Sequence, residues 1–426
     1  MGIATTKRPQ LNSTSDIFFV ALVIFMLSLS NKLGTLSALS FVLLITYQVI
    51  MQRSVVHKMI IKNFGILLFP LFCIVSSVWS DSPGRTFYFA TQYFLTIFVS
   101  ALITYSVPYR SIIFGCFLGF GAYAILAILF GNTVNVGADG DIAFVGLAGS
   151  KNQAGETAFV SLLWILGSVI AVKDRWRIPA WIFGFISAVA CLFLLLNARA
   201  TSALIFTAIG VPLFILLILV SKVPMVIRGL IVVLTIVLSS IIAVTSPFWA
   251  SEAFRLALES AGKDVTLTGR VVLWDAAAEL ISQRPVLGNG FAGFWRIENP
   301  DAQYLWNAMA VSQGAPFNFH NTFLDLLVNV GSVGLVLYCS CVIVCIYLIL
   351  KSFIMTPNIF VVISLTLLLC TLPKASFEVL GLAPFNLLTV TLFLALSYGA
   401  NIAVKEPRGL VPKAAKLQDQ EHLNST

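Results

Sequence analysis

One histidine stands where a long polar stretch of the sequence passes into an apolar run. The chain has three histidines, at positions 57, 320 and 422, and only His320 has this setting, in Phe319-His320-Asn321. Imidazole suits proton transfer near neutral pH, so His320 is a candidate general base. A histidine at the start of a helix can also serve only as a cap, and the residues alone leave both interpretations open.

Two basic residues begin predicted helices, where a positive charge is unfavourable. Lys151 starts an apolar run, and Arg270 starts an amphipathic stretch. The helix macrodipole disfavours a cation at this end by roughly 0.3–1 kcal/mol, whereas free N–H groups beside a cation form a phosphate site. An anionic ligand would therefore explain both placements. The alternative for Arg270 is an ion pair with Asp264 or Asp275.

Arg199 occupies the short turn Asn197-Ala198-Arg199-Ala200 between two apolar runs. If both runs cross a bilayer, its guanidinium lies at the membrane boundary and can bind an anion there. The alternative is that the side chain only extends to lipid headgroups.

Aromatic residues gather in the polar stretch before His320, and Trp295 is the one that we take as a candidate sugar contact. Tryptophan and tyrosine are also general features of membrane interfaces, and this alternative is favoured. One histidine with scattered carboxylates predicts no metal site. The seven cysteines all fall in apolar runs, so we expect no structural disulfide.

The composition decides which kind of scaffold positions these residues. Hydrophobic residues make up 59% of the 426 residues and charged residues 10%, with a mean hydropathy of +0.96. A soluble domain carries about 25% charged residues, so a soluble protein is excluded. The net charge of +8 comes from dispersed basic residues and does not indicate nucleic-acid binding.

Apolar runs long enough for a bilayer predict an all-α, polytopic membrane protein with about twelve spans. We place them at 16–30, 33–50, 64–79, 86–106, 111–131, 153–172, 178–196, 201–221, 226–246, 322–350, 357–372 and 379–400. Most lysines and arginines fall on one side of these spans, which predicts cytoplasmic termini, residues 1–15 and 401–426. Spans one to nine then occupy 16–246 and spans ten to twelve 322–400.

The long connection 247–321 is predicted to form an ordered lobe outside the membrane, because it is rich in aromatic residues. We expect an interfacial helix at Phe248–Ala261 and a second helix at Gly269–Gln283.

Several motifs in this order resemble those of the O-antigen ligase and polysaccharide polymerase family, and most closely its exopolysaccharide polymerases of the succinoglycan type. They are Gly149-Ser150-Lys151-Asn152 with Gly155, Asn197-Ala198-Arg199-Ala200, Leu267-Thr268-Gly269-Arg270 through Trp274, Arg284-Pro285-Val286-Leu287-Gly288-Asn289-Gly290-Phe291 with Phe294-Trp295, and His320-Asn321-Thr322-Phe323-Leu324-Asp325 with Gly331 and Gly334. A weaker match is Trp79-Ser80 with Pro83. Asn197 departs from the serine-rich turn that is more usual in the family.

The resemblance implies a GT-C-like membrane glycosyltransferase that needs no cofactor, metal or nucleotide sugar. Its donor would be an undecaprenyl-diphosphate-linked oligosaccharide at the outer face of a bacterial inner membrane. The resemblance assigns Arg199 and Arg270 to the diphosphate and His320 to proton transfer. We add Lys151, Asn152, Arg284 and Trp295 as candidate substrate contacts.

Three functions follow from these features. The first is polymerisation of lipid-linked repeats, with a flippase and chain-length or export proteins as candidate partners. The second is ligation of finished chains to a lipid or protein acceptor. A twelve-span transporter or flippase is disfavoured, because the spans hold few charges and show no repeated halves.

The predicted orientation is testable by cysteine-accessibility labelling in intact cells. An impermeant reagent should label residues 250–318, and it should reach residues 53–62 and the tail after Lys405 only after the membrane is opened. Labelling with the opposite pattern would place the long connection on the cytoplasmic side and exclude a donor at the outer face.

Overall fold

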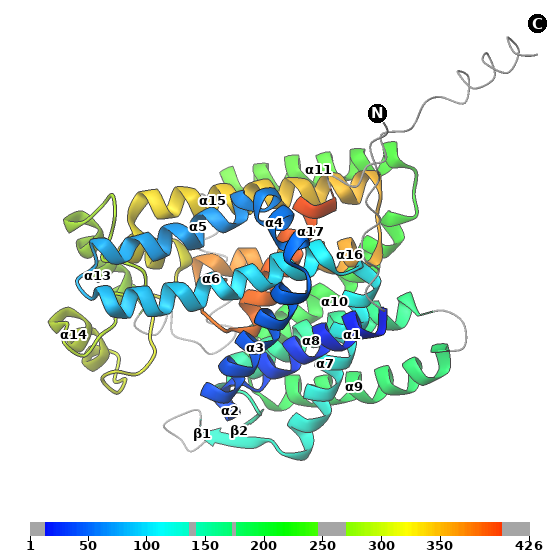
Figure 1. Cartoon of the computed structure of the whole chain (residues 1–426), viewed down its shortest axis with the longest axis horizontal. Coiled ribbons are helices and arrows are strands. Elements are labelled where there is room, and N and C mark those ends of the chain that lie inside the picture. Colours follow the sequence, from blue (N-terminus) through cyan, green and yellow to red (C-terminus); the bar gives the residue numbers. More distant parts are fainter. Residues whose placement is uncertain (1–12, 136–141, 173–175, 246–269, 403–426) are drawn as a thin grey trace, which may run out of the picture.

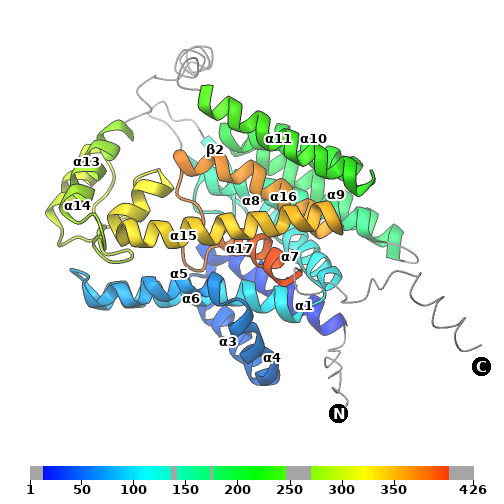
Figure 2. The ribbon, with the colours of Figure 1, turned by 90° about the horizontal axis from the view of Figure 1, so that it is seen from above.

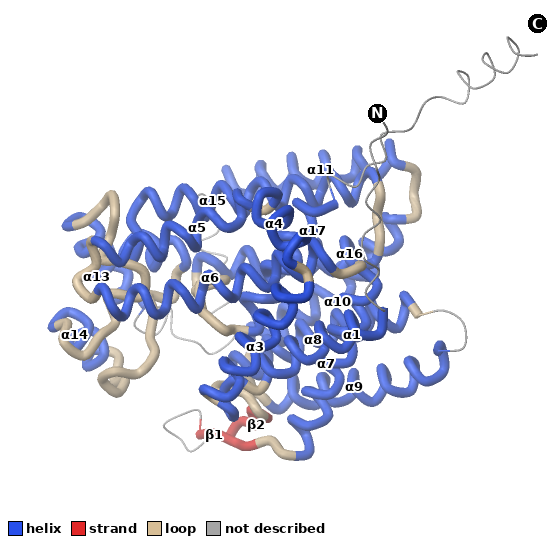
Figure 3. The backbone as a smooth tube through the Cα atoms, viewed as in Figure 1, coloured by secondary structure: helices blue, strands red, loops and turns tan. Residues whose placement is uncertain are grey.

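The computed structural model describes residues 13–135, 142–172, 176–245 and 270–402, and within these ranges the fold is almost wholly helical (Figures 1 and 3). One antiparallel hairpin joins β1 (Asn132–Asn135) to β2 (Ile142–Gly146). The prediction of an all-α polytopic membrane protein is confirmed. The predicted interfacial helix at Phe248–Ala261 lies outside the described residues, as do residues 1–12 and 403–426.

Each predicted span contains an apolar helix, and most of the bounds agree within a few residues. These helices are α1 (Ser13–Ser28), α3 (Thr35–Met51), α5 (Phe64–Val75), α6 (Pro83–Ser106), α7 (Tyr109–Leu129), α8 (Lys151–Ala171), α9 (Arg177–Asn197), α10 (Thr201–Ser221), α11 (Met225–Thr245), α15 (Thr322–Met355), α16 (Ile359–Thr371) and α17 (Leu387–Ile402).

The number of spans is not confirmed. Eight of the described helices are long and apolar enough to cross a membrane. Three others are shorter: Thr14–Ser28, Phe64–Val78 and Leu387–Asn401. The second predicted span, 33–50, corresponds to α3, which meets α4 (Arg53–Lys62) at a bend of 103°, as in a broken span or a re-entrant loop.

The last predicted span, 379–400, begins later than its hydropathy suggested. Residues 377–386 are irregular, and α17 starts at Leu387 because the Asn386 side chain accepts hydrogen bonds from the amides of Leu388 and Thr389. Pro384 disfavours helical geometry in the residue before it, and an asparagine is among the best helix caps. This irregular segment carries Glu378, whose role is described below.

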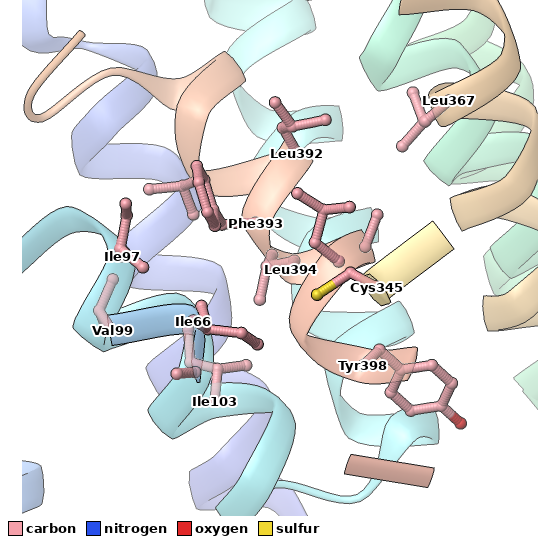
Figure 4. Packing of buried hydrophobic residues seen from close by; sticks show 14 of the residues in the cluster. Ile66, Ile97, Val99, Ile103, Cys345, Leu367, Leu392, Phe393, Leu394 and Tyr398 are labelled. Atoms are coloured by element: carbon pink, nitrogen blue, oxygen red, sulfur yellow. The ribbon is translucent and has the colours of Figure 1, made fainter. Parts of the chain in front are cut away.

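Interdigitating apolar side chains form the centre of the helix bundle. Leu392, Phe393 and Leu394 of α17 pack between Ile97 of α6 and Cys345 of α15, and all five are buried (Figure 4). Close approach elsewhere depends on glycine. A Cβ at Gly115 of α7 would lie 2.5 Å from Val20 of α1, which shows how tightly these two helices pack.

The segment 270–321 folds beyond the ends of α6 and α15 (Figures 1 and 2). It contains α13 (Arg270–Gln283), in agreement with the helix predicted there, and α14 (Pro300–Ala308). A separate hydrophobic cluster holds this lobe together. Its buried members are Leu273, Ala277, Leu280, Phe294, Trp295, Ala302, Leu305, Trp306, Phe319 and Val328.

The lobe is joined to the bundle where α15 is broken at Gly331. Gly331 has φ 64° and ψ −170°, so its neighbours lose their helical hydrogen bonds. The amide of Ser332 donates to Pro285 O at 2.9 Å, and that of Val333 donates to Val286 O at 3.2 Å. The motif Arg284–Phe291 thus completes the backbone of the broken helix.

A second attachment comes from the connection between α5 and α6. The Trp79 indole donates to Leu287 O at 3.0 Å, and the amide of Phe291 donates to Ser76 Oγ at 3.0 Å. A Cβ at Gly290 would lie 2.4 Å from that of Ser80. Two motifs from distant parts of the sequence therefore pack directly together and orient the lobe.

Replacing Gly331 with alanine should destabilise the protein strongly. The added Cβ would lie 2.2 Å from Val286 O, and the positive φ alone costs a non-glycine residue about 1–2 kcal/mol. We expect low membrane yield and a lower melting temperature in detergent. Gly65→Ala on α5 is the matched control, because no atom lies within 4 Å of its added Cβ. Equal stability of the two variants would contradict this account of the break.

Candidate active site

His320 and Glu378 come together at the junction of the lobe and the helix bundle. His320 Nδ1 lies 3.5 Å from Glu378 Oε2, and both side chains are 28% exposed. At this distance the contact is an ionic approach rather than a short hydrogen bond, and Nδ1 has no hydrogen-bond partner within strict geometry. The pair joins two segments that are 58 residues apart in the sequence.

Arg270 contacts the other oxygen of the same carboxylate. Its Nη2 lies 3.2 Å from Glu378 Oε1, with 24% of the arginine side chain exposed. Glu378 therefore bridges the two residues that the sequence singled out for anion binding and proton transfer. The predicted alternative of a pair with Asp275 is not what the structure contains, and Asp264 lies outside the described residues.

His320 does not cap the helix that follows it. The N-cap of α15 is Asn321, whose side-chain oxygen accepts from the amides of Phe323 and Leu324 at 2.9 and 3.1 Å. His320 instead has φ 49°, and its amide donates to Asn318 Oδ1 at 2.8 Å. The left-handed conformation turns the imidazole away from the helix start and toward Glu378.

Backbone contacts hold the segment of Glu378 beside that of His320. The Thr322 hydroxyl donates to Glu378 O at 2.7 Å and accepts from the amide of Leu380 at 3.0 Å. Tyr338 donates to Leu380 O, and Tyr93 donates to Gly381 O at 2.8 Å. The site is therefore fixed by helices α6 and α15 of the bundle and not only by loop contacts.

Neighbouring cations hold Glu378 in its ionised form. Burial alone would raise the pKa of this carboxyl group, but the contact with His320 and the positive charges of Arg270 and Lys374 together lower it below its ordinary value. A permanent negative charge at this position can orient the imidazole and stabilise it when it takes up a proton.

The structure places the turn that carries Arg199 against α8, the helix that Lys151 begins. Lys151 is the first residue of α8, as predicted, and Asn152 follows it on the exposed first turn. A Cβ at Gly155 would lie 2.8 Å from that of Ala200 and 2.6 Å from that of Ala203. Gly155 thus lets the turn that carries Arg199, with φ 53°, lie directly on the start of α8.

Arg284 and Trp295 make structural contacts. Arg284 Nη1 lies 2.9 Å from Asp81 Oδ1 and links the lobe to the α5–α6 connection. Trp295 is 8% exposed and packs edge-to-face on Phe294 and Phe317. Both side chains thus have structural partners, and their role as substrate contacts stays a prediction.

Asp325, another carboxylate near His320, accepts hydrogen bonds from its own surroundings. Asp325 is buried, and its oxygens accept from the amide of Phe319 at 3.4 Å and from Asn329 at 3.2 Å. Within the ranges that the structure describes, no cluster of three or more His, Cys, Asp or Glu side chains could hold a metal ion.

Comparison with known proteins shows what this chain is similar to. The O-antigen ligase family matches residues 186–339, which include Arg199, Arg270 and His320. The chain is also 26% identical over 336 residues to the exopolysaccharide production protein ExoQ of Rhizobium meliloti (strain 1021), which covers 78% of this chain and 76% of that protein. Both matches support the resemblance to the ExoQ-like O-antigen ligase and polysaccharide polymerase family that the sequence motifs indicated.

The family match covers only part of the candidate site. Lys151 and Asn152 precede the matched region and Glu378 follows it, while the other candidate residues lie within it. Glu378 carried no motif, and its only sequence signal was that of a carboxylate on the predicted outer side. Its position is evident only from the fold.

The lowered pKa of Glu378 predicts a specific pH dependence of stability. An ionised Glu378 stabilises the folded protein above its ordinary pKa of 4.5, and this contribution is lost as the pH falls through the lowered folded-state value. Glu378→Gln should therefore lower the melting temperature at pH 7, and the difference from the wild-type protein should shrink in acid.

Thermal melting in detergent between pH 7 and pH 3 checks this expectation. Glu279→Gln is the control, because Glu279 lies on the exposed face of α13. A Glu378→Gln protein as stable as the wild type at pH 7 would show that the carboxylate does not hold the two cations in place.

Proposed function

We propose that the protein polymerises oligosaccharide repeats, carried on a polyprenyl diphosphate, into exopolysaccharide at the outer face of a bacterial inner membrane. The arrangement of Arg270 and His320 on one carboxylate is the observation that carries the proposal. Arg270 supplies a positive charge that can bind a phosphate group, and His320 supplies a base that can take the proton of a hydroxyl group. The similarity to a protein named for exopolysaccharide production supports the same reaction class.

His320 is the proposed general base. Glu378 lies at Nδ1, which favours the tautomer with a proton there and leaves Nε2 to accept a proton from the acceptor. The acceptor hydroxyl oxygen attacks the anomeric carbon of the donor while its proton passes to Nε2. Attack from the face opposite the leaving group inverts the configuration at that carbon.

The cationic residues are proposed to hold the leaving group. As the bond between the anomeric carbon and the phosphate oxygen breaks, its electron pair remains on the polyprenyl diphosphate. Arg270 and Arg199 stabilise this charge, with Lys151 and Asn152 at the exposed N-terminal turn of α8 as further contacts. These side chains supply the electrostatic stabilisation without a metal ion.

Ligation is the second candidate, because the matching family is described as O-antigen ligase. It uses the same donor and the same bond-making step, and only the acceptor differs. The polysaccharide of a deletion strain separates the two functions. Single repeats without long polymer indicate a polymerase, whereas intact polymer that remains on its lipid carrier indicates a ligase.

Arginine substitutions test the anion site. In liposomes with lipid-linked repeats, we expect Arg199→Ala and Arg270→Ala to abolish chain growth. Arg270→Lys should remain strongly impaired because lysine keeps the charge but lacks the planar donor pair for phosphate oxygens. Arg177→Ala, at the opposite end of α9 from Arg199, is the control. Full-length polymer from both alanine variants at normal protein levels would remove the anion site from the mechanism.

Asparagine at position 320 separates a catalytic role from a backbone role. Asparagine accepts the left-handed conformation of His320 well, so His320→Asn should fold normally. Loss of a general base should reduce the rate of chain growth by ~10²–10⁴, with donor binding largely retained. His57→Asn, on α4, is the control. A fully active His320→Asn protein would assign proton transfer to another group.

A further inference from the structure

A second pair of charged residues is more deeply buried than the Glu378 group, and the mechanism proposed above gives it no contact with the substrate. Lys374 and Glu156 form an ion pair in which the lysine side chain is 7% exposed and the glutamate side chain 21% exposed. The ammonium group also lies 5.3 Å from the centre of the Phe206 ring. Removing charges from water costs several kcal/mol per ion, so stability alone is a poor explanation for this pair.

The ion pair lies at an otherwise apolar cavity between α8, α10, α16 and α17. Its apolar lining includes Phe159, Ala203, Phe206, Leu367, Leu380 and Leu392. Leu367 and Leu392 project from α16 and α17 respectively (Figure 4). Lys374 and Glu156 are the charged residues among those that line it, so the cavity combines a hydrophobic wall with one cation and one anion.

The position of Lys374 connects the cavity to the proposed active site. Lys374 lies in the 3₁₀ helix η4 (Leu372–Ser376), and its carbonyl accepts from the amides of Phe377 and Glu378, both at 2.8 Å. Its charge acts on the Glu378 carboxylate. Leu380 and Gly381, which follow Glu378, form part of the cavity wall. The cavity therefore lies directly behind the segment that carries Glu378.

Glu156 connects the same cavity to the other cationic group. It follows Gly155, the residue on which the Arg199 turn packs, and it lies on the helix that Lys151 begins. The ion pair is thus connected through η4 to the segment that carries Glu378, and through α8 to the helix start that carries Lys151.

We propose that the Lys374–Glu156 ion pair is an exchangeable latch, in which Lys374 leaves Glu156 to bind the diphosphate of a polyprenyl diphosphate and Glu156 competes with that ligand. The inference rests on the proposed function, since it names a further binding residue for the same donor. A diphosphate offers more negative charge than one carboxylate, so it can displace Glu156. Release of the pair exposes the apolar wall to the first isoprene units.

Only the fraction of the protein in which the latch is open can bind the lipid, so the apparent Kd equals the intrinsic Kd divided by that fraction. Glu156→Gln should raise that fraction and remove a repulsive charge, so binding becomes roughly threefold to tenfold tighter. Lys374→Met keeps the length of the side chain but loses the charge. It should weaken binding roughly tenfold to hundredfold, which is the usual effect of losing a charged hydrogen bond.

The test measures binding of undecaprenyl diphosphate to the full-length protein in nanodiscs, without sugar and without turnover. Lys222→Met is the control, because Lys222 lies at the far end of α10 from the Arg199 turn. Opposite shifts for the two variants support the latch. If the pair were purely structural, loss of either charge would weaken binding of the lipid. Weaker binding by both variants, or unchanged binding by either, would therefore overturn the proposal.

A charge-exchanged variant covers the case in which a single variant does not fold. Glu156→Lys combined with Lys374→Glu keeps an ion pair in place but presents a carboxylate where the diphosphate would bind. It should fold and bind the lipid at least as weakly as Lys374→Met is expected to, and binding of wild-type strength would overturn the proposal. Chain growth by the wild-type protein, measured separately, reports on the proposed function independently of the latch.

Discussion

The arrangement of the whole site depends on one carboxylate that is only partly exposed to water. Glu378 needs positive charge to offset its loss of hydration, and it obtains that charge from a residue on each side. The same contacts hold Arg270 and His320 at fixed separations from a common atom group. Glu378 thus determines where Arg270 and His320 lie relative to each other.

The rest of the fold brings together three segments that are distant in the sequence, one of which carries this carboxylate. α13 carries Arg270, the residue before the cap of α15 is His320, and the irregular segment before α17 carries Glu378. The Thr322 hydroxyl joins the last two through a pair of backbone hydrogen bonds. Because α15 is broken at Gly331, its first part is held by the lobe as much as by the bundle. The lobe and the membrane helices therefore act as one support for the site.

Much of this was accessible from the sequence, for reasons that differ between residues. Hydropathy located the apolar helices because bilayer thickness constrains their length, and the start of α13 at Arg270 followed from helix-terminal signals. His320 was conspicuous because histidine is rare in this chain. Glu378 and Lys374 were not, since their partners lie on other helices and only tertiary packing joins them. Trp295 lies in the buried cluster of the lobe, and its burial was not predictable because an aromatic residue in a polar stretch suits a small buried core as well as a binding surface.

The contact between the lobe and the break in α15 at Gly331 is made by backbone groups and not by side chains. Pro285 and Val286 contribute carbonyl groups, Ser332 and Val333 contribute amides, and Gly288 and Gly331 contribute the absence of a Cβ. Evolution can therefore replace most side chains along this contact without changing its hydrogen bonds, whereas the glycines allow no such drift. A protein with a very different sequence could therefore keep the same angle between the lobe and the membrane helices, provided that it kept Gly288 and Gly331.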